Sequence, residues 1–142
     1  MEIKIKILDS SLPYPSYAHE GDAGIDLYSS IEAVLKPFER MLIPTGISVS
    51  IPQGYAGFVQ PKSGLAIKHG ISLVNTPGLI DSGYRGEIKA VVINLDPLNN
   101  FAVSKGAKIC QLVILKIENA DLLFIDELDS SDRGEGGFGS TG

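Results

Sequence analysis

Short apolar segments separated by turn-forming residues restrict the fold of this chain more than any other feature. These segments either alternate apolar with polar side chains or form short β-rich runs, as strands do. Turn signals such as Pro77-Gly78 and Ser104-Lys105-Gly106 separate them. Many short strands at this spacing favour a barrel or a jelly-roll-like sandwich over a βαβ sheet. The expected strands span residues 3–8, 47–51, 56–59, 71–74, 88–95, 109–117 and 122–125.

One helix and one change of composition complete the predicted organisation. Only residues 63–69 favour a short helical turn, and the composition changes at about Asp129, where a Gly-rich tail begins. A Gly-rich terminus has little apolar surface to bury and is expected to be flexible. We therefore predict an all-β domain over residues 1–128, built as a jelly-roll-like distorted barrel. A flexible C-terminal arm is expected over residues 129–142.

Charge and side-chain chemistry argue against several classes of function. The chain of 142 residues has a net charge of −5, which disfavours general binding to nucleic acid or to an anionic membrane. His19 and His69 are far apart in the sequence and have no cysteine near them, so a protein-ligated zinc site is not expected. Cys110 is the single cysteine and lies in an apolar run, where we expect a buried structural thiol. With no targeting segment and no intrachain disulfide, the expected location is the cytoplasm.

Two common nucleotide motifs do not fit the sequence. Gly134, Gly136 and Gly139 match the pattern GxGxxG, but that fingerprint needs a strand before it, a helix after it and an acidic residue further on. Only three residues follow Gly139, so a Rossmann fold is not expected. The P-loop pattern GxxxxGK[ST] does not occur. A phosphate site in this chain must therefore use another scaffold.

Two segments in the first half of the chain carry polar side chains that suit a phosphate ligand. Asp26 follows Gly24 by two residues in an otherwise apolar stretch, where an acid close to glycine is most often a turn residue. Lys62, Ser63 and Gly64 follow one another, and a cation, a hydroxyl and a glycine in succession can form an anion nest. An ordinary Ser-Gly turn explains the same residues equally well.

Two segments in the second half are similarly ambiguous. Pro77 and Gly78 should force a sharp bend that presents Asp81 and Tyr84 near a hairpin tip, although a plain Asp-Ser-Gly hairpin has the same sequence. Gln111 is the one polar residue within an apolar run, so its amide must find a partner or point to solvent. A ligand is only one of several possible partners.

The C-terminal arm combines an arginine, an aromatic ring and two hydroxyls, separated by glycines. Arg133 can bind phosphate oxygens through two parallel hydrogen bonds, and Phe138 can stack on a base. Ser140 and Thr141 can donate hydrogen bonds to a ligand. The alternative is a disordered tail, which is the usual explanation of a Gly- and Ser-rich terminus.

Taken together, these five segments resemble the five ordered motifs of the trimeric dUTPases. They occur in the order of that family and at about its spacing, and the resemblance covers essentially the whole chain. It implies a homotrimer with active sites shared between subunits. Fourteen extended residues of the arm reach roughly 45 Å, which allows the arm to cross to a neighbouring site.

The resemblance implies roles for the residues around the phosphates. Asp26 matches the acid that holds waters around a catalytic Mg²⁺ ion, which is itself held mainly by the substrate phosphates. Lys62, Ser63 and Gly64 match one phosphate-binding motif, and Gln111 belongs to a second. The family usually has arginine where this chain has Lys62, so the charge is kept but the two-pronged hydrogen bonding is lost.

The resemblance also implies roles for the residues around the nucleoside. Asn75 and Gly78 match the hairpin that recognises uracil, largely through its backbone. Asp81 matches the general base, and Tyr84 matches the ring that stacks under the deoxyribose. The tight hairpin and the ring are expected to exclude thymine and ribose.

Within the arm, Arg133 matches the arginine that binds the γ-phosphate, and Phe138 matches the ring that covers uracil. Gly137, Ser140 and Thr141 match positions that wrap the phosphates. The implied reaction is Mg²⁺-assisted hydrolysis of dUTP to dUMP and pyrophosphate, which keeps uracil out of DNA and supplies dUMP for thymidylate synthesis. Two alternatives remain: a dCTP deaminase of the same fold, and a non-catalytic nucleotide-sensing module.

Overall fold

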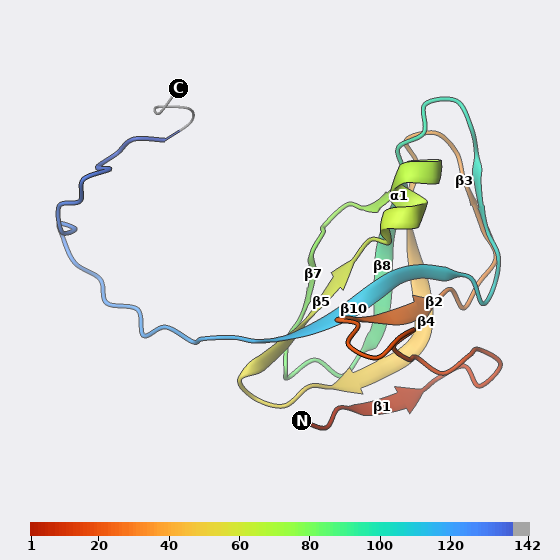
Figure 1. Cartoon of the computed structure of the whole chain (residues 1–142), viewed down its shortest axis with the longest axis horizontal. Coiled ribbons are helices and arrows are strands. Elements are labelled where there is room, and N and C mark those ends of the chain that lie inside the picture. The colour runs from red at the N-terminus through yellow and green to blue at the C-terminus, as the bar shows by residue number, and fades with distance from the viewer. Residues whose placement is uncertain (138–142) are drawn as a thin grey trace.

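The computed structural model describes residues 1–137 and is built almost entirely of β-strands (Figure 1). The predicted all-β class is therefore confirmed, and so is the short helix, whose bounds agree with the expected residues 63–69. No helix in the described part of the chain is long and apolar enough to span a membrane. The elements are β1 Lys4–Ile7, β2 Gly24–Tyr28, β3 Ala33–Leu35, β4 Arg40–Ser50, β5 Tyr55–Gln60, α1 Ser63–His69, β6 Ile71–Leu73, β7 Gly78–Ile80, β8 Glu87–Asn94, β9 Phe101–Val103 and β10 Lys108–Lys116.

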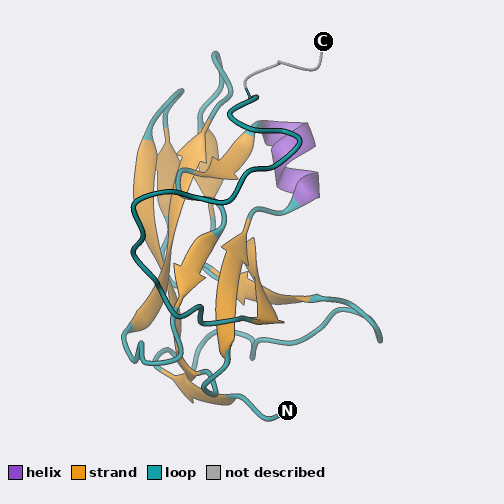
Figure 2. Ribbon diagram, turned by 90° about the vertical axis from the view of Figure 1, so that its left-hand side faces the viewer, coloured by secondary structure: helices purple, strands orange, loops and turns teal. Residues whose placement is uncertain are grey.

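The strands form two four-stranded sheets and one two-stranded sheet. The orders are β1-β4-β8-β6, β2-β10-β5-β7 and β3-β9. Every pair of neighbouring strands is antiparallel, and most neighbours are distant in sequence. These crossing connections give the jelly-roll-like arrangement that the sequence predicts, as distorted separate sheets instead of one closed barrel. Helix α1 lies near the end of the strands opposite the N-terminus (Figure 2).

The core is formed by the alternating side chains of the long strands. In β8, for example, Ile88, Ala90 and Val92 are buried, whereas the residues between them are more exposed, as a strand with one face on the core requires. Cys110 lies in this core and is fully buried, and burial raises the pKa of its thiol to about 12. The expected structural thiol is therefore confirmed, because the reactive thiolate does not form at neutral pH.

Helix α1 is held by its C-terminal cap. Gly70 adopts a left-handed conformation (φ 67°, ψ 21°) and donates its backbone N–H to the carbonyl of Ala66 at 3.0 Å. Glycine takes this conformation without steric cost, so it ends the helix and lets the chain turn into β6. The helix therefore begins directly at the Lys62-Ser63-Gly64 motif and is fixed at its other end.

One predicted strand is wrong. Residues 122–125 are irregular backbone, and Leu122, Leu123 and Phe124 expose 79%, 85% and 90% of their surface. The chain leaves the second sheet after β10, so these residues have no neighbouring strand to pair with (Figure 1). Within residues 117–137 the structure has turns but no strand or helix. The division into residues 1–128 and 129–142 stays a prediction.

Candidate active site

A carboxylate with two lysines is the most strongly charged arrangement near the predicted phosphate motifs. Asp26 lies in β2 and exposes only 7% of its side chain. One carboxylate oxygen accepts a hydrogen bond from the ammonium group of Lys62, the residue just before helix α1. The other carboxylate oxygen pairs with the ammonium group of Lys108, at the start of β10, with 2.7 Å between the oxygen and Nζ. Two cations and one anion leave this cluster with a net positive charge, which suits an anionic ligand.

The ionisation of Asp26 is set by two opposing effects. Burial raises the pKa of its carboxyl group, but the hydrogen bonds and charges of Lys108 and Lys62 outweigh burial. The net result is a pKa below the ordinary value of 3.8. Asp26 raises the pKa of Lys108 in turn. At neutral pH the cluster therefore holds a carboxylate and two ammonium ions.

Gln111 lies next to this cluster. In the ladder of β10 with its two neighbours, Gln111 pairs with Asp26 of β2 on one side and with Gln60 of β5 on the other. Its side-chain Nε2 donates a hydrogen bond to the carbonyl of Pro61 at 3.0 Å. Asp26, Lys62 and Gln111 line one pocket of about 340 Å³. The structure thus brings together three of the side chains predicted to bind phosphate or metal, and we call this pocket the phosphate pocket.

Ser63 and Gly64 form the first turn of helix α1 and are exposed. Neither lines the phosphate pocket, although Lys62 precedes them directly. Their predicted contact with phosphate stays a prediction.

A second pocket, of about 530 Å³, gathers the residues expected to bind the nucleoside. Asn75, Gly78 and Tyr84 all line it, and we call it the hairpin pocket. Strand β7 pairs with β5 in the second sheet, whereas β8 pairs with β4 and β6 in the first. The predicted hairpin is therefore wrong, because the turn at Asp81 joins strands of two different sheets. A side chain on Gly78 would meet the Asn75 amide at 3.3 Å, so glycine keeps the pocket open here.

Tyr84 is held in a fixed position by backbone contacts. Its hydroxyl donates a hydrogen bond to the carbonyl of Glu87 at 3.0 Å, and its N–H donates to the carbonyl of Asp81 at 3.0 Å. Asp81 itself follows directly after β7, is exposed, and is not among the residues that line the hairpin pocket. The turn from Asp81 to Tyr84 therefore fixes the spacing between the predicted base and the predicted sugar-binding ring.

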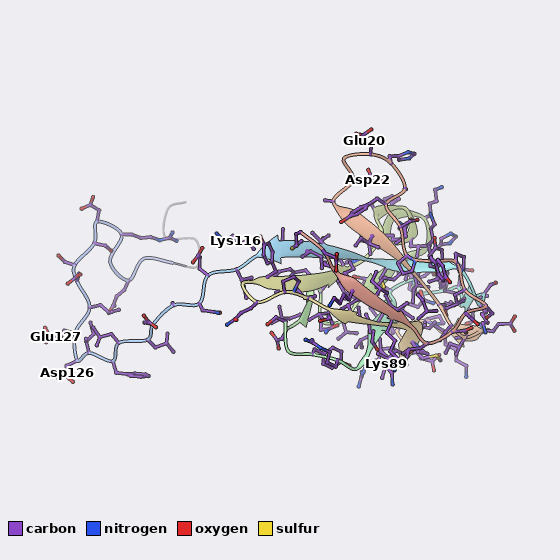
Figure 3. The ribbon with its side chains drawn as sticks, turned by 90° about the horizontal axis from the view of Figure 1, so that it is seen from below. Glu20, Asp22, Lys89, Lys116, Asp126 and Glu127 are labelled. Atoms are coloured by element: carbon purple, nitrogen blue, oxygen red, sulfur yellow. The ribbon has the colours of Figure 1, made fainter. Side chains whose placement is uncertain are left out.

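The arm runs away from the sheets in the described structure. Arg133 is exposed, and its Nε donates a hydrogen bond to the carbonyl of Gly136 at 2.8 Å. Figure 3 shows Asp126 and Glu127, which precede the arm, far from the body of the strands. Arg133 and Gly137 therefore do not meet the two pockets of their own chain. Phe138, Ser140 and Thr141 lie outside the described residues.

The two pockets are separate within one chain. Among residues 1–137, none lines both of them. Val59 lines the hairpin pocket and Gln60 the phosphate pocket, and consecutive residues of a strand point to opposite faces of the sheet. One chain alone therefore does not place the phosphate-binding and nucleoside-binding residues in a single cavity.

Sequence reasoning missed Lys108. Its partner Asp26 is distant in sequence, and the two meet only because β10 pairs with β2. The ladder shifts register between Lys108 and Cys110, and no local pattern predicts such a shift. The available signal was a cation three residues before Gln111 in the same motif.

The described residues offer little to a metal ion on their own. Among residues 1–137, no group of three or more His, Cys, Asp or Glu side chains could hold a metal. Asp22 and Asp26 are the two carboxylates that line the phosphate pocket. Such a donor set fits only an ion that takes most of its ligands from elsewhere.

Comparison of the sequence with known proteins gives a match along its whole length. The sequence pattern of the dUTPase family matches residues 10–142. The chain is 52% identical over 142 residues to the deoxyuridine 5'-triphosphate nucleotidohydrolase of Clostridium kluyveri, covering 100% of this chain and 99% of that protein. It is 50% identical over 142 residues to the protein of the same name from Thermobifida fusca, covering 100% and 79% respectively.

Solved structures give the same result. The dUTPase of Staphylococcus bacteriophage 80alpha, in complex with dUpNHpp, superposes with a TM-score of 0.91 at 32% identity, over 99% of this chain and 98% of that one. A mutant dUTPase of phage phi11 of S. aureus, described for its structural Mg(II) ion, superposes with a TM-score of 0.82 at 27% identity, over 89% and 98%. Family pattern, identity and fold agree, and the chain belongs to the dUTPase family.

Proposed function

We propose that this chain hydrolyses dUTP to dUMP and pyrophosphate, in a site assembled from several copies of the chain. The observation that carries the proposal is the phosphate pocket, which Asp26, Lys62 and Gln111 line, in a chain that aligns with dUTPases over its full length. Lys108 does not line this pocket, but it binds the second carboxylate oxygen of Asp26. A triphosphate carries several negative charges. The two ammonium groups that flank the buried carboxylate can form ion pairs with phosphate oxygens as well as with the carboxylate.

Phosphate binding is the first step. When a triphosphate enters, Lys62 and Lys108 gain phosphate oxygens as partners in addition to Asp26. The Gln111 amide donates a further hydrogen bond, and Ser63 and Gly64 at the start of helix α1 contribute a hydroxyl and a backbone N–H. Lys62 binds as a point charge, because an ammonium group lacks the two-pronged geometry of arginine.

The residues of the phosphate pocket fit a magnesium ion that arrives with the substrate. Mg²⁺ usually binds through one or two carboxylates plus phosphates and waters, and Asp26 would hold such waters with its carboxylate. The bound ion would supply charge neutralisation on the phosphates as pyrophosphate leaves.

Asp81 is the proposed general base. Its carboxylate can orient a water and accept its proton as the water attacks the α-phosphate. Its exposure in a single chain is consistent with a site that is completed by a neighbouring copy.

Base and sugar selectivity come from the hairpin pocket. Gly78 and Asn75 line the space for uracil, and the backbone that lines this pocket supplies the donors and acceptors that distinguish uracil from cytosine. The narrow pocket excludes the methyl group of thymine. Tyr84, held by Glu87 and packed beneath the sugar, leaves no room for a 2′-hydroxyl.

The proposed assembly is a homotrimer. The separation of the phosphate pocket from the hairpin pocket in one chain supports this, as does an arm that leaves its own body. In the trimer, the arm of a neighbour brings Arg133 to the γ-phosphate, Phe138 to uracil, and Gly137, Ser140 and Thr141 to the phosphates. Closure of the arm excludes bulk water from the reaction.

The proposed role is to keep uracil out of DNA and to supply dUMP for thymidylate synthesis in the cytoplasm. The alternative of a dCTP deaminase has less support, because Ser63 is followed by Gly64 and because Asp81 and Tyr84 fit the dUTPase motif. A purely nucleotide-sensing module has less support because Asp81, the proposed base, and the C-terminal arm are both present.

Product analysis tests the proposal directly. The purified chain is incubated with Mg²⁺ and with dUTP, dCTP, dTTP or UTP, and the products are separated by anion-exchange chromatography. We expect dUMP and pyrophosphate from dUTP alone. Deamination of dCTP would assign the chain to the sister activity, and tight binding without turnover would assign it to a sensor.

Complementation between inactive variants tests the shared site. Lys62→Ala and Asp81→Asn chains are inactive separately, and we expect a mixture that is unfolded and refolded together to regain part of the activity. The mixed trimers contain some sites with both wild-type residues only if the two residues of a site come from different chains. Activity no higher than that of the separate variants would place both residues of a site on one chain.

A further inference from the structure

Gly24 leaves a notch in strand β2, and the side chain of Gln111 lies in that notch. Gln111 pairs with Asp26 in the ladder between β10 and β2. Gly24 precedes Asp26 by two residues, so both lie on the same face of β2, which is also the face that Gln111 shares. A Cβ atom on Gly24 would overlap the side-chain oxygen of Gln111 and lie 3.0 Å from its Cδ. This position of the amide therefore requires glycine at residue 24.

The orientation of the Gln111 amide is also determined. A carbonyl oxygen can only accept hydrogen bonds, so the hydrogen bond to Pro61 at 3.0 Å fixes the amide nitrogen toward the loop before helix α1. The amide oxygen must then point the other way, which is toward Gly24. One N–H of the amide is bound to Pro61, and the second remains as a donor.

The direction of this amide matters in a phosphate pocket. Phosphate oxygens accept hydrogen bonds, so an amide that turned its oxygen toward them would repel the ligand, whereas its nitrogen attracts it. The notch holds the oxygen against β2, and Pro61 holds the nitrogen on the side of Lys62. Gly24 and Gln111 line the same pocket as Lys62 and Asp26.

We infer that Gly24 is a positioning residue, which acts by seating the Gln111 amide with its donor side toward the phosphates of the substrate. This inference rests on the proposed function and deepens it. Glycine is needed here for space and not for its backbone freedom, because residue 24 is an ordinary strand position outside the left-handed region. An alanine at residue 24 can therefore form the strand but cannot seat Gln111.

The test is a double-mutant cycle on the full chain, with Gly24→Ala, Gln111→Ala and the double variant. A hydrogen bond to a charged group is worth enough that its loss should raise the KM for dUTP by about ten-fold or more in Gly24→Ala, with a smaller change in kcat. In the Gln111→Ala background, Gly24→Ala should cost less than about two-fold, because the amide it would displace is already gone.

Gly57→Ala is the matched control. Gly57 lies in the same sheet, in β5, and a Cβ atom there would approach the apolar side chains of Ile51 and Leu112 to 2.9 Å. This variant should lower the melting temperature, leave the KM unchanged, and show no coupling to Gln111→Ala. It separates crowding in the core from crowding of the amide.

The outcomes separate this inference from the proposed function. If the wild-type chain hydrolyses dUTP and the costs of the two substitutions simply add, the positioning role is wrong and the activity stands. If the wild-type chain shows no turnover, the proposed function fails. The NMR signals of the ¹⁵N-labelled Gln111 side-chain NH₂ group then test whether Gly24 positions the amide. Signals that move to solvent-exposed values in Gly24→Ala support the notch, and unchanged signals refute it.

Discussion

The ring of Tyr84 lies directly against Gly86, so closely that a Cβ atom on Gly86 would lie 2.6 Å from the Cζ of the ring. The hydroxyl of Tyr84 reaches over this glycine to the carbonyl of Glu87. The proposed sugar-binding ring therefore packs against the backbone of Gly86, and this position has no room for a side chain. The missing side chain of Gly86 has a function that the sequence of this turn alone does not reveal.

Gly86→Ala should displace the ring without changing its chemistry. We expect discrimination between dUTP and UTP, measured as the ratio of the two kcat/KM values, to fall roughly ten-fold, because the ring no longer blocks the 2′-hydroxyl. Tyr84→Ala should have the same effect, whereas Tyr84→Phe keeps the ring and should keep most of the selectivity. Unchanged discrimination in Gly86→Ala and Tyr84→Ala would refute the steric explanation.

Asp81→Asn should remove turnover and leave binding nearly intact. Loss of a general base costs about 10²–10⁴-fold in rate, whereas the amide keeps the size of the carboxylate. The measurements are kcat for dUTP and the affinity for dUpNHpp by calorimetry. Asp96→Asn is the control, since Asp96 caps its own loop through hydrogen bonds to Leu98 and Asn99 and should not affect kcat. Substantial turnover in Asp81→Asn would exclude this residue as the base.

The sequence predicts some strands and misses others. Strands β8 and β10 have enough alternating or β-branched residues to be recognised, and the short strands β1 and β6 were also expected. The strands β2, β3, β7 and β9 were missed, as was the first half of β4. These short strands exist because tertiary pairing stabilises them, and pairing is not visible in a local pattern. Residues 122–125 show the converse, since their apolar side chains predict a strand that has no partner in this chain.

The candidate site divides in the same way. Motif spacing was sufficient to select Asp26, Lys62 and Gln111, and the structure brings these three together in one pocket. It could not select Lys108, which depends on strand register. The motifs also could not reveal that Gly24 and Gly86 leave space for the side chains of Gln111 and Tyr84, because this depends on where those side chains lie in the folded chain.

Lys108→Met should make stability less dependent on pH. The pKa of Asp26 is lowered in the folded chain, so Asp26 contributes stability above the ordinary value of 3.8, and this contribution is lost as pH falls through the lower folded value. Without Lys108 the folded pKa of Asp26 rises, and part of this stability disappears at neutral pH. The melting temperatures of variant and wild type should therefore differ most near pH 7 and converge as pH falls through the lowered folded pKa of Asp26. An equal difference at all pH values would contradict the ion pair as its cause.

Deletion of residues 133–142 should reduce turnover without affecting the fold. The described part of the arm, residues 129–137, leads away from the strands of its own chain (Figure 1), and an arginine that binds transferring phosphates is worth about 10²-fold or more in rate. Steady-state kinetics should show this loss, while the melting temperature and the molar mass from light scattering stay unchanged. Glu135→Gln keeps the arm at full length and should retain activity. A large fall in melting temperature would mean that the arm is structural.

Asn94→Ala should be strongly destabilising. Asn94 is fully buried, donates to the carbonyls of Leu35 and Asn99 at 3.1 and 2.8 Å, and accepts the N–H of Asp96 at 2.9 Å. Loss of this amide leaves buried backbone groups without partners, at a cost of about 2–4 kcal/mol in the free energy of unfolding. Urea denaturation measures the cost, and the exposed Asn100→Ala should change it by less than about 0.5 kcal/mol.

The course of the arm also divides the charge of the molecule. Residues 1–116 carry 11 basic and 10 acidic side chains, whereas residues 117–142 carry one basic and seven acidic side chains. The strands thus form a nearly neutral body, and the negative field of the chain originates from the segment that leads away from it (Figure 1). A triphosphate diffusing toward the protein is repelled on the side of the arm and not on the side of the sheets. In the proposed mechanism, the acidic segment would direct anionic ligands toward the body, and Arg133 would be its one cation available to a phosphate.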